Sequence, residues 1–191
     1  MKYSQPDFYT FSEDSIHLAR FAIAKLAGVD GFSLLDLCAG CGVVGLEIAQ
    51  ASLGYKKISF LEAQAAFLES LNANISELAL SHKTEVLSNK FQDISSGGWD
   101  YIVCNPPYYD ETKGRPSSDV QRHMCLHYPK DFPEQLVSFI KKSLKDNGRA
   151  WVCLNRKHQT APWENIFNSS SLKIELIDYK YLRIYELSSE F

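Results

Sequence analysis

Long apolar runs are missing from this 191-residue sequence, because charged residues interrupt every hydrophobic stretch before membrane-spanning length. The first residues also lack the basic and then apolar pattern of a secretory signal peptide. Both absences argue against a membrane-embedded or exported protein. We therefore expect a cytoplasmic protein with no membrane partner.

A strong excess of one charge is missing as well. Lys and Arg number 20, Asp and Glu number 23, and the net charge is −3. This balance argues against a broad, non-specific nucleic-acid surface, although it is compatible with a local basic patch. The five cysteines are an odd number, and most lie in predicted strands or in a glycine-rich turn. They are typical of reduced thiols rather than of a disulfide framework.

The length and the 45% hydrophobic content suit one domain with one core. We expect a single domain over residues 1–191, with an N-terminal cap segment and helix at 1–31 and a catalytic core at 32–191. A monomer is expected.

Predicted strands alternate with predicted helices along the chain. Apolar periodicity and capping residues predict helices near 12–28, 43–53, 68–78 and 131–144, with a weaker one at Trp163–Phe167. Short β-branched or aromatic runs predict strands at 32–38, 57–62, 84–88, 100–104, 149–154, 173–177 and 181–187. This order predicts an α/β fold with a mostly parallel seven-stranded sheet and a C-terminal antiparallel hairpin. Residues 110–130 show no clear period and are expected to form a long polar loop.

Local residues predict where several elements begin and end. Ser12 can cap the first helix and Gly28 can end it. Asp131 is expected to cap the helix that follows it, with a proline in the first turn. Asn147 and Gly148 are expected to turn the chain into the strand that begins at residue 149.

The stretch Asp100–Tyr109 starts as a buried strand and stops at Asn105-Pro106-Pro107-Tyr108. The prolines donate no ladder hydrogen bonds, so the strand must end there in a rigid tip. The Asn105 side-chain oxygen and a neighbouring carbonyl, such as that of Pro106, can accept the two N–H groups of a planar amine. Tyr108 can stack on the ring that carries this amine. Such a tip can catalyse transfer to the amine by positioning and oriented dipoles. The alternative is an ordinary strand end with a proline-rich turn.

Polar side chains follow or end several predicted strands. Asp36, Glu62, Asp93 and Asn105 all fall at or just beyond these ends. Ligands of parallel α/β sheets bind outside the carboxyl ends of the strands. We therefore expect these four residues to share one site.

Residues Gly40–Gly45 match the G-x-G-x-x-G pattern, which fits either a dinucleotide or another nucleoside cofactor. Asp36 lies just before this loop, and a carboxylate there opposes a pyrophosphate and favours a cationic ligand. The sulfonium and ammonium groups of S-adenosylmethionine satisfy that preference. An NAD(P)-dependent oxidoreductase is the more remote alternative.

Taken together, Asp36–Gly42, Glu62, Asp93 and the Asn-Pro-Pro-Tyr tip resemble the amino-methylating type of class I S-adenosylmethionine-dependent methyltransferases, which have a Rossmann-like fold. The segment Gln5–Ser15 is similar to that of bacterial tRNA adenine-N6 methyltransferases that modify position 37 beside the valine anticodon. The resemblance implies the following roles: Asp36, Gly40 and Gly42 at the methionine end, Glu62 at the ribose, Asp93 at the adenine, Phe11 and Ser12 closing over the cofactor, and Asn105, Pro106 and Tyr108 at the acceptor amine.

The resemblance implies an RNA partner, most simply tRNA, and leaves two related acceptors open. These are a release-factor glutamine and an amino group in another nucleic acid. Candidate RNA contacts are Lys113, Arg115, Arg122, Lys130 and Arg156-Lys157-His158.

Two patterns resemble metal sites. These are Cys38-x-x-Cys41 in the glycine loop, and His123-x-x-x-His127 with Cys125. No fourth ligand is evident for the second, and packing explains the first, so we expect no metal.

Overall fold

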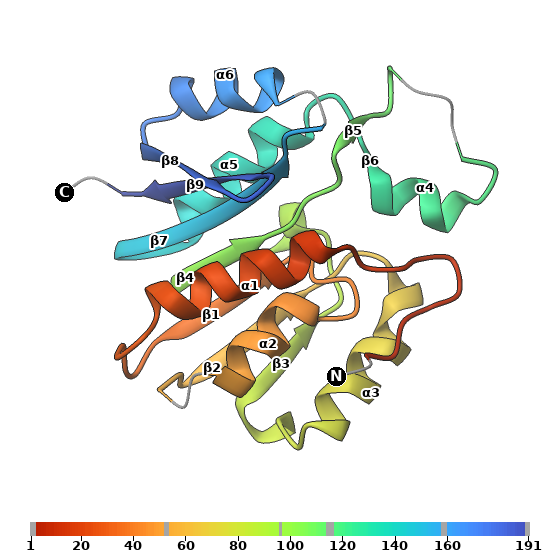
Figure 1. Cartoon of the computed structure of the whole chain (residues 1–191), viewed down its shortest axis with the longest axis vertical. Helices are drawn as coiled ribbons and strands as arrows, with labels where there is room; N and C mark the ends of the chain where they lie inside the picture. The colour runs from red at the N-terminus through yellow and green to blue at the C-terminus, as the bar shows by residue number, and fades with distance from the viewer. Residues whose placement is uncertain (1–2, 52–53, 96, 114–116, 158–159, 190–191) are drawn as a thin grey trace.

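A seven-stranded sheet forms the centre of the protein (Figure 1). The computed structural model describes residues 3–51, 54–95, 97–113, 117–157 and 160–189. The strand order is β3-β2-β1-β4-β7-β9-β8. The strands are β1 (Ser33–Leu37), β2 (Lys57–Leu61), β3 (Thr84–Leu87), β4 (Trp99–Cys104), β7 (Leu144–Asn155), β8 (Lys173–Tyr179) and β9 (Leu182–Ser188). The first five of these pair in parallel, and β9 is antiparallel to both β7 and β8. The predicted fold, with its C-terminal hairpin, is confirmed.

Helices cover both faces of this sheet, as Figure 1 shows. The buried residues of α1 (Glu13–Lys25), α2 (Val43–Ala51) and α3 (Leu68–Glu77) belong to one core cluster. Those of α5 (Phe132–Ser143) and α6 (Ala161–Ser169) belong to a second cluster on the opposite face. In the part of the chain that the structure describes, the connections include the 3-10 turns η1 (Ala65–Phe67), η2 (Ser81–Lys83) and η3 (Phe91–Asp93).

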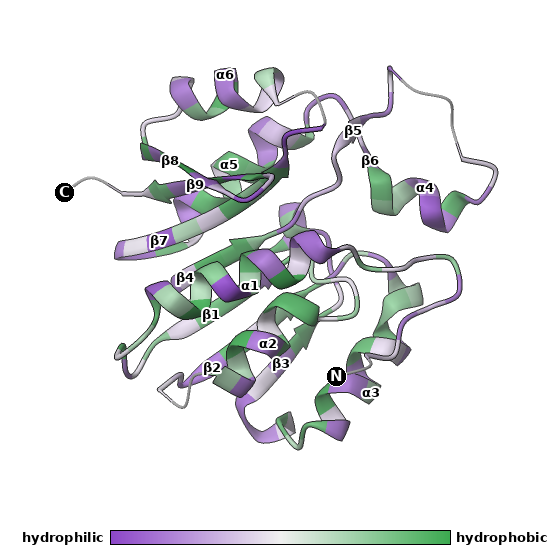
Figure 2. Cartoon of the chain, in the orientation of Figure 1, coloured by the Kyte–Doolittle hydropathy of each residue, from purple (hydrophilic) through white to green (hydrophobic). Residues whose placement is uncertain are grey.

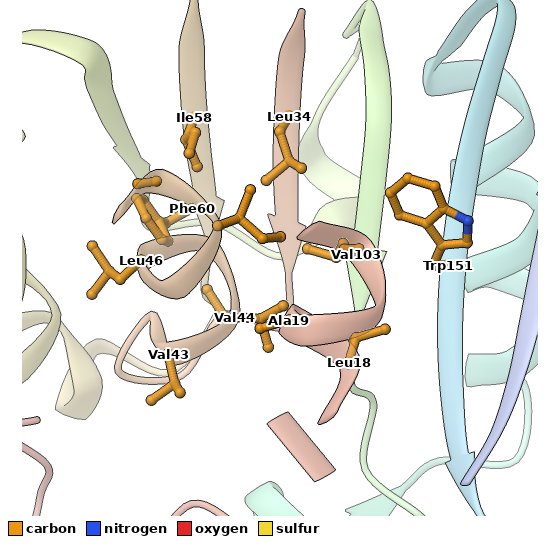
Figure 3. Packing of buried hydrophobic residues seen from close by; sticks show 14 of the residues in the cluster. Leu18, Ala19, Leu34, Val43, Val44, Leu46, Ile58, Phe60, Val103 and Trp151 are labelled. Atoms are coloured by element: carbon orange, nitrogen blue, oxygen red, sulfur yellow. The ribbon is translucent and has the colours of Figure 1, made fainter. Parts of the chain in front are cut away.

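Alternate residues of each central strand feed the two clusters. Leu34, Ile58 and Val103 face α1 and α2, where Figure 3 shows them beside Leu18 and Leu46. Leu35, Ile102 and Cys104, which are neighbours of Leu34 and Val103 along the strands, belong to the other cluster. Burying such a side chain contributes about 1.5–3 kcal/mol, so both faces hold the sheet in one register.

The covering helices are amphipathic, and Figure 2 shows apolar and polar bands along them. In α5, Leu136, Phe139 and Ile140 are buried against the sheet, while Lys141 and Lys142 are exposed. Among the described segments, none of the helices combines the length and the apolar character needed to cross a membrane.

The expectation of one long loop at residues 110–130 is wrong in part. A short helix, α4 (Val120–Leu126), lies within it, and the Asp119 carboxylate caps this helix by accepting the Arg122 N–H at 3.0 Å. Two-residue strands β5 (Tyr109–Asp110) and β6 (His127–Tyr128) pair on either side of the helix. Seven helical residues are too few for a clear apolar period, which explains the missed prediction.

The helix caps also differ in detail from the prediction. Ser12 and Asp131 occupy the N-cap positions of α1 and α5, but neither side chain makes a capping hydrogen bond. The C-cap of α1 is Leu26, and Gly28 follows with a φ of 78°. The chain therefore turns after the helix has already ended.

The expected turn at Asn147 and Gly148 lies inside β7, which begins at Leu144. Asn147 has a φ of 62°, and the pairing with β4 shifts register there, from Trp99 with Leu144 to Tyr101 with Arg149. The turn signal thus produces an irregularity within a longer strand.

Candidate active site

A cavity of about 390 Å³ opens at the carboxyl ends of β1, β2 and β4. The glycine loop after β1, residues 61–64 at the end of β2 and residues 89–92 after β3 form part of its wall. The tip after β4 contributes Asn105 and Pro107. The segment before α1 and the region from α4 to Phe132 complete it. The cavity lies where parallel α/β sheets bind their ligands.

Close packing between the glycine loop and the sheet requires two of its glycines. Gly42 has a φ of 85°, a conformation that L side chains rarely adopt. A Cβ atom on Gly45 would lie 2.6 Å from the Phe60 ring and 3.0 Å from the Asp36 carboxylate. The loop therefore lies directly against β2 and brings Gly40 and Cys41 into the cavity wall.

Asp36 lies beneath this loop and is only 2% exposed. Its Oδ2 atom accepts the Gly45 N–H at 2.8 Å. Burial raises the pKa of Asp36 to about 8, against the opposing effect of this hydrogen bond. The structure thus places Asp36 behind the loop, where its hydrogen bond to Gly45 fixes the start of α2. The residues that line the cavity include Gly40 and Cys41 rather than Asp36, and the expected role of Asp36 at the methionine end stays a prediction.

Glu62 reaches the cavity wall directly and is 6% exposed. Its Oε2 atom accepts the Gly40 N–H at 2.7 Å, and Oε1 accepts the Gln64 N–H at 2.7 Å. Burial raises the pKa of Glu62, and these backbone hydrogen bonds oppose that rise. Each oxygen retains a lone pair that can accept a ligand hydroxyl, as the sequence predicts for a ribose.

Asp93 lies on η3 and is exposed. Residues 89–92, just before it, form the cavity wall instead. Phe91 and Gln92 are therefore better placed than Asp93 to meet a ligand. An acid soon after the third strand therefore predicts which segment forms this part of the cavity wall, but not which residue of the segment lines it.

The segment before α1 closes one side of the cavity. Tyr9 and Phe11 line it, and Tyr9 packs edge-on against Phe67 with ring centroids 5.5 Å apart. Ser12 is exposed, whereas Ser15, one turn along α1, lines the cavity. The sequence prediction thus identified the segment and Phe11, and missed Tyr9 and Ser15.

Asn74 on α3 holds the beginning of that segment. Its Oδ1 atom accepts the Ser4 N–H at 2.8 Å, and its Nδ2 atom donates to the carbonyls of Ser4 and Cys41, both at 2.9 Å. Asn74 is 2% exposed. The buried amide therefore ties the N-terminal segment to the glycine loop.

Asn105 lies at the cavity wall among polar partners. Its Nδ2 atom donates to the Ser15 hydroxyl at 3.0 Å. Its Oδ1 atom accepts from the Tyr108 hydroxyl at 2.5 Å and from the Cys153 thiol at 3.3 Å. The tip is thus fixed by α1 on one side and by β7 on the other.

Tyr108 points into the protein rather than across the cavity. Its hydroxyl lies 2.9 Å from Asp14 Oδ2 as well as near Asn105. Burial raises the pKa of the Tyr108 hydroxyl, and so do Cys153 and Asp14. Pro106 is buried, and Pro107 lines the cavity in its place. The structure brings Asn105 to the cavity and gives Tyr108 a supporting position instead of the expected stacking one.

The region around α4 forms the outer part of the cavity. His123 and His127 both line it, and their rings stack with centroids 4.1 Å apart. The Cys125 thiol approaches Gln64 Nε2 at 3.6 Å. Within the described ranges, no group of three or more His, Cys, Asp or Glu residues could hold a metal ion. The two histidines present stacked rings in the wall of the cavity.

The candidate RNA contacts differ in their surroundings. Arg122 and Lys130 are exposed near the cavity, on α4 and before α5. Lys113 approaches the Asp110 carboxylate at 3.5 Å, and Arg156 forms an ion pair with Asp178. Arg115 and His158 lie outside the described residues.

Comparisons with known proteins agree with this arrangement. The family model described as "Methyltransferase small domain" matches residues 10–183. A tRNA1(Val) (adenine(37)-N6)-methyltransferase from Shewanella sp. (strain W3-18-1) is 29% identical over 126 residues, covering 63% of this chain and 51% of that protein. A release factor glutamine methyltransferase from Borreliella burgdorferi is 25% identical over 157 residues, covering 79% and 52%. The chain spans about half the length of these curated relatives.

Solved structures show the same fold at lower identity. A SAM-dependent O-methyltransferase from Thermotoga maritima superposes with a TM-score of 0.69 at 14% identity, covering 100% of this chain and 69% of that one. A 16S rRNA methyltransferase from T. thermophilus, solved with AdoMet and guanosine, superposes with a TM-score of 0.68 at 20% identity, covering 95% and 44%. The family and the cofactor predicted from the sequence, S-adenosylmethionine, are confirmed.

Proposed function

Because this chain belongs to the methyltransferase small domain family, we propose that it transfers a methyl group from S-adenosylmethionine to the N6 amine of an adenine in RNA, most specifically in tRNA near the anticodon. The Asn105 tip at the wall of the cavity is the observation that carries the proposal. The Asn105 amide, which donates to the Ser15 hydroxyl, can accept an N–H group of an amine, whereas it has no group that assists hydride transfer.

The residues of the cavity fit the cofactor. Glu62 offers carboxylate oxygens to the ribose hydroxyls, while Gly40 and Cys41 allow a close backbone approach at the methionine end. Phe67 and Phe91 supply apolar surface for the adenine ring. When bound, S-adenosylmethionine supplies an electrophilic methyl group next to the tip.

The acceptor amine would be held by oxygen atoms of the tip. The Asn105 carboxamide and a backbone carbonyl beside Pro107 accept its N–H groups, which favours the pyramidal nitrogen needed for attack. The nitrogen lone pair forms the new bond to the methyl carbon, and the proton leaves afterwards to solvent. This route needs orientation and desolvation more than a strong base.

The observations favour adenine in a flexible RNA loop. Several curated relatives are named tRNA adenine-N6 methyltransferases, and one of them, from Bacteroides thetaiotaomicron, is 32% identical over 116 residues. A base in an anticodon loop costs little to extrude into a pocket. The stacked His123 and His127 rings at the outer wall offer flat surfaces for a base.

A release-factor glutamine is the second candidate acceptor. One relative that covers 79% of this chain carries that name. The same Asn105 tip could hold a primary amide, which presents N–H groups in a plane as adenine does. A release factor is therefore the second substrate in the test of the proposal.

The deciding experiment supplies labelled S-adenosylmethionine with either unmodified tRNA or a release factor. Labelled N6-methyladenosine in digested tRNA is the expected result. Label in glutamine and none in tRNA would reject the RNA proposal in favour of the second candidate. S-adenosylmethionine binding is measured in parallel by calorimetry, so that an inactive preparation is recognised.

A further inference from the structure

Exposed large apolar side chains are few in the part of the chain that the structure describes, and they are unevenly placed. They are Tyr109, Val120, Met124 and Leu176. Three of these four lie in the segment from β5 to β6 (residues 109–128), which Figure 1 shows beside the sheet. Val120 is 71% exposed and Met124 is 48% exposed, and they share one face of α4 because they are four positions apart. A single exposed apolar residue is ordinary, whereas two on one helix face beside a cavity indicate a contact surface.

This Val120–Met124 face continues into the cavity. Met124 lines the cavity wall, and so do its neighbours His123 and Cys125. The Cys125 thiol lies 3.6 Å from Gln64 Nε2, which holds another side of α4 against the rest of the protein. Val120 is not among the residues of the wall. A molecule that covers the whole face therefore has one part inside the cavity and another part outside it, as a macromolecular acceptor does.

The helix that carries this face is held on both sides. The pairing of β5 with β6 places Tyr109 opposite His127, and the His127 and His123 rings stack with centroids 4.1 Å apart. The Ser117 N–H donates to His123 Nδ1 at 3.3 Å. The Val120–Met124 face is thus fixed at the mouth of the cavity before a ligand arrives, which lowers the cost of ordering it on binding.

The charges around this face favour a nucleotide as its occupant. Asp119 accepts a backbone N–H as the cap of α4, and Asp110 forms an ion pair inside the segment, which leaves Glu111 at the cavity wall. Arg122 on α4 and Lys130 just after β6 are exposed, and within the described ranges neither forms an ion pair. Two available cations beside an apolar face suit a group that combines a flat base with a phosphate.

We propose that the Val120–Met124 face of α4 docks the nucleotide next to the acceptor adenine, so that its base packs on Met124 while the adenine enters the cavity. This inference rests on the proposed RNA methylation. A flexible thioether side chain adapts to the face of any base, so the surface recognises an unpaired neighbour rather than a particular sequence. The preferred substrate is then an RNA strand that is unpaired at two successive positions.

The substitution Met124→Gln tests this contact because glutamine keeps an unbranched side chain of similar length and removes its apolar character. We expect the KM for an anticodon stem-loop RNA to rise by about threefold to tenfold. The value of kcat and the affinity for S-adenosylmethionine should stay within about twofold. Leu176→Gln, at a residue on β8 that is 49% exposed, is the matched control and should leave KM unchanged. Thermal unfolding shows whether each variant is folded.

Substrates that lack one base make the assignment specific. In two further stem-loops, the nucleotide before or after the acceptor adenine carries no base. One of these abasic RNAs should raise the KM of the unaltered chain as Met124→Gln does, and on that RNA Met124→Gln should add less than about twofold, because both changes remove the same contact. Independent effects on both abasic RNAs, or a KM that rises in Met124→Gln for a release factor but not for RNA, would overturn the docking role.

Photo-crosslinking tests the same contact without turnover. RNA that carries 4-thiouridine beside the acceptor adenine is irradiated with the unaltered chain and S-adenosylhomocysteine, and the crosslinked peptide is identified by mass spectrometry. A crosslink to α4 is the expected result, and crosslinks elsewhere or none at all would reject the docking surface. Absence of methyl transfer to RNA by the unaltered chain rejects the proposed function, and the crosslink still reports where the strand lies.

Discussion

Glu62 and Gly40, twenty-two residues apart, are joined by a hydrogen bond of 2.7 Å from the Gly40 N–H to Glu62 Oε2. The second carboxylate oxygen holds the Gln64 N–H at the same distance. Glu62 therefore does two things at once: it shapes the glycine loop and faces the cavity. A substitution there should change the shape of the site as well as its hydrogen-bonding groups.

Glu62→Gln should weaken S-adenosylmethionine binding by about tenfold to a hundredfold. Hydrogen bonds to a charged group contribute about 1.5–3 kcal/mol, and the amide turns an NH₂ group toward a backbone donor. Titration calorimetry measures the affinity. Glu85→Gln, on β3 in an exposed ion pair with Lys57, is the control and should bind normally. Equal affinities for both variants would contradict the assigned role of Glu62.

Asn105→Ala should remove methyl transfer and spare cofactor binding. Loss of one oriented dipole at a reacting group commonly lowers kcat by about a hundredfold to a thousandfold. Single-turnover transfer from labelled S-adenosylmethionine is the measurement. Asn168→Ala, exposed on α6, provides the comparison. Retained turnover in Asn105→Ala would show that the tip does not hold the acceptor.

Gly45→Ala should destabilise the fold by about 1–3 kcal/mol, because its Cβ would come within 2.6 Å of Phe60 in a packed interior. Gly98→Ala is the control, since its Cβ would make only ordinary contacts, at 3.6 Å to the nearest Lys145 atom. Urea unfolding gives both free energies. Similar values for the two variants would refute the tight contact between the glycine loop and the sheet.

The raised pKa of Asp36 predicts a pH dependence of stability. In the folded protein this carboxyl keeps its proton up to a pKa of about 8, whereas its ordinary value is 3.8. Between these values the folded state binds more protons than the unfolded state, so the contribution to stability falls as pH rises. The slope is at most about 1.4 kcal/mol per pH unit.

Asp36→Asn should flatten this decline, since the amide carbonyl still accepts the Gly45 N–H and carries no titrating proton. The decline of the unfolding free energy is measured by urea unfolding of both proteins between pH 5 and pH 8, in steps of about one pH unit. If the unfolding free energy falls equally with pH in both proteins, Asp36 does not titrate as its burial predicts.

The exposed cations near the cavity should act on substrate binding alone. Replacing Arg122 and Lys130 together by Gln should raise the KM for tRNA and leave kcat unchanged, because phosphate contacts position RNA without sharing in the reaction. Lys173→Gln, an exposed residue on β8, is the control. The salt dependence of KM should weaken by about 0.7 per lost phosphate contact. An unchanged salt dependence would place the RNA elsewhere.

The order of strands and the edge that carries the site could be predicted from the sequence. Apolar runs and turn residues are local, and they correctly placed Glu62 and Asn105 at the ends of β2 and β4. The hydrogen bond between Asp14 and Tyr108 joins residues 94 positions apart. No local pattern encodes such a contact, because it depends on how α1 crosses the end of the sheet.

Burial also changes the role of individual residues, and the sequence alone does not show which residues become buried. The sequence presents Asp36 as a charged neighbour of the glycine loop, yet full burial raises its pKa to about 8. Asp93 and Ser12 lie beside the residues that form the wall, since a 3-10 turn and a helical turn rotate their neighbours inward. The sequence therefore predicts segments more reliably than individual side chains.

The amide of Asn74 bears on how quickly a bound ligand can leave. The wall that contains Tyr9 and Phe11 is secured near Ser4 by hydrogen bonds at 2.8 and 2.9 Å. Such a segment can detach by local unfolding, at a much smaller free energy than the sheet requires. The buried Tyr3, whose hydroxyl donates to Glu47 at 2.6 Å, anchors the same segment, so local opening of this wall is a route by which a bound cofactor leaves while the sheet stays folded.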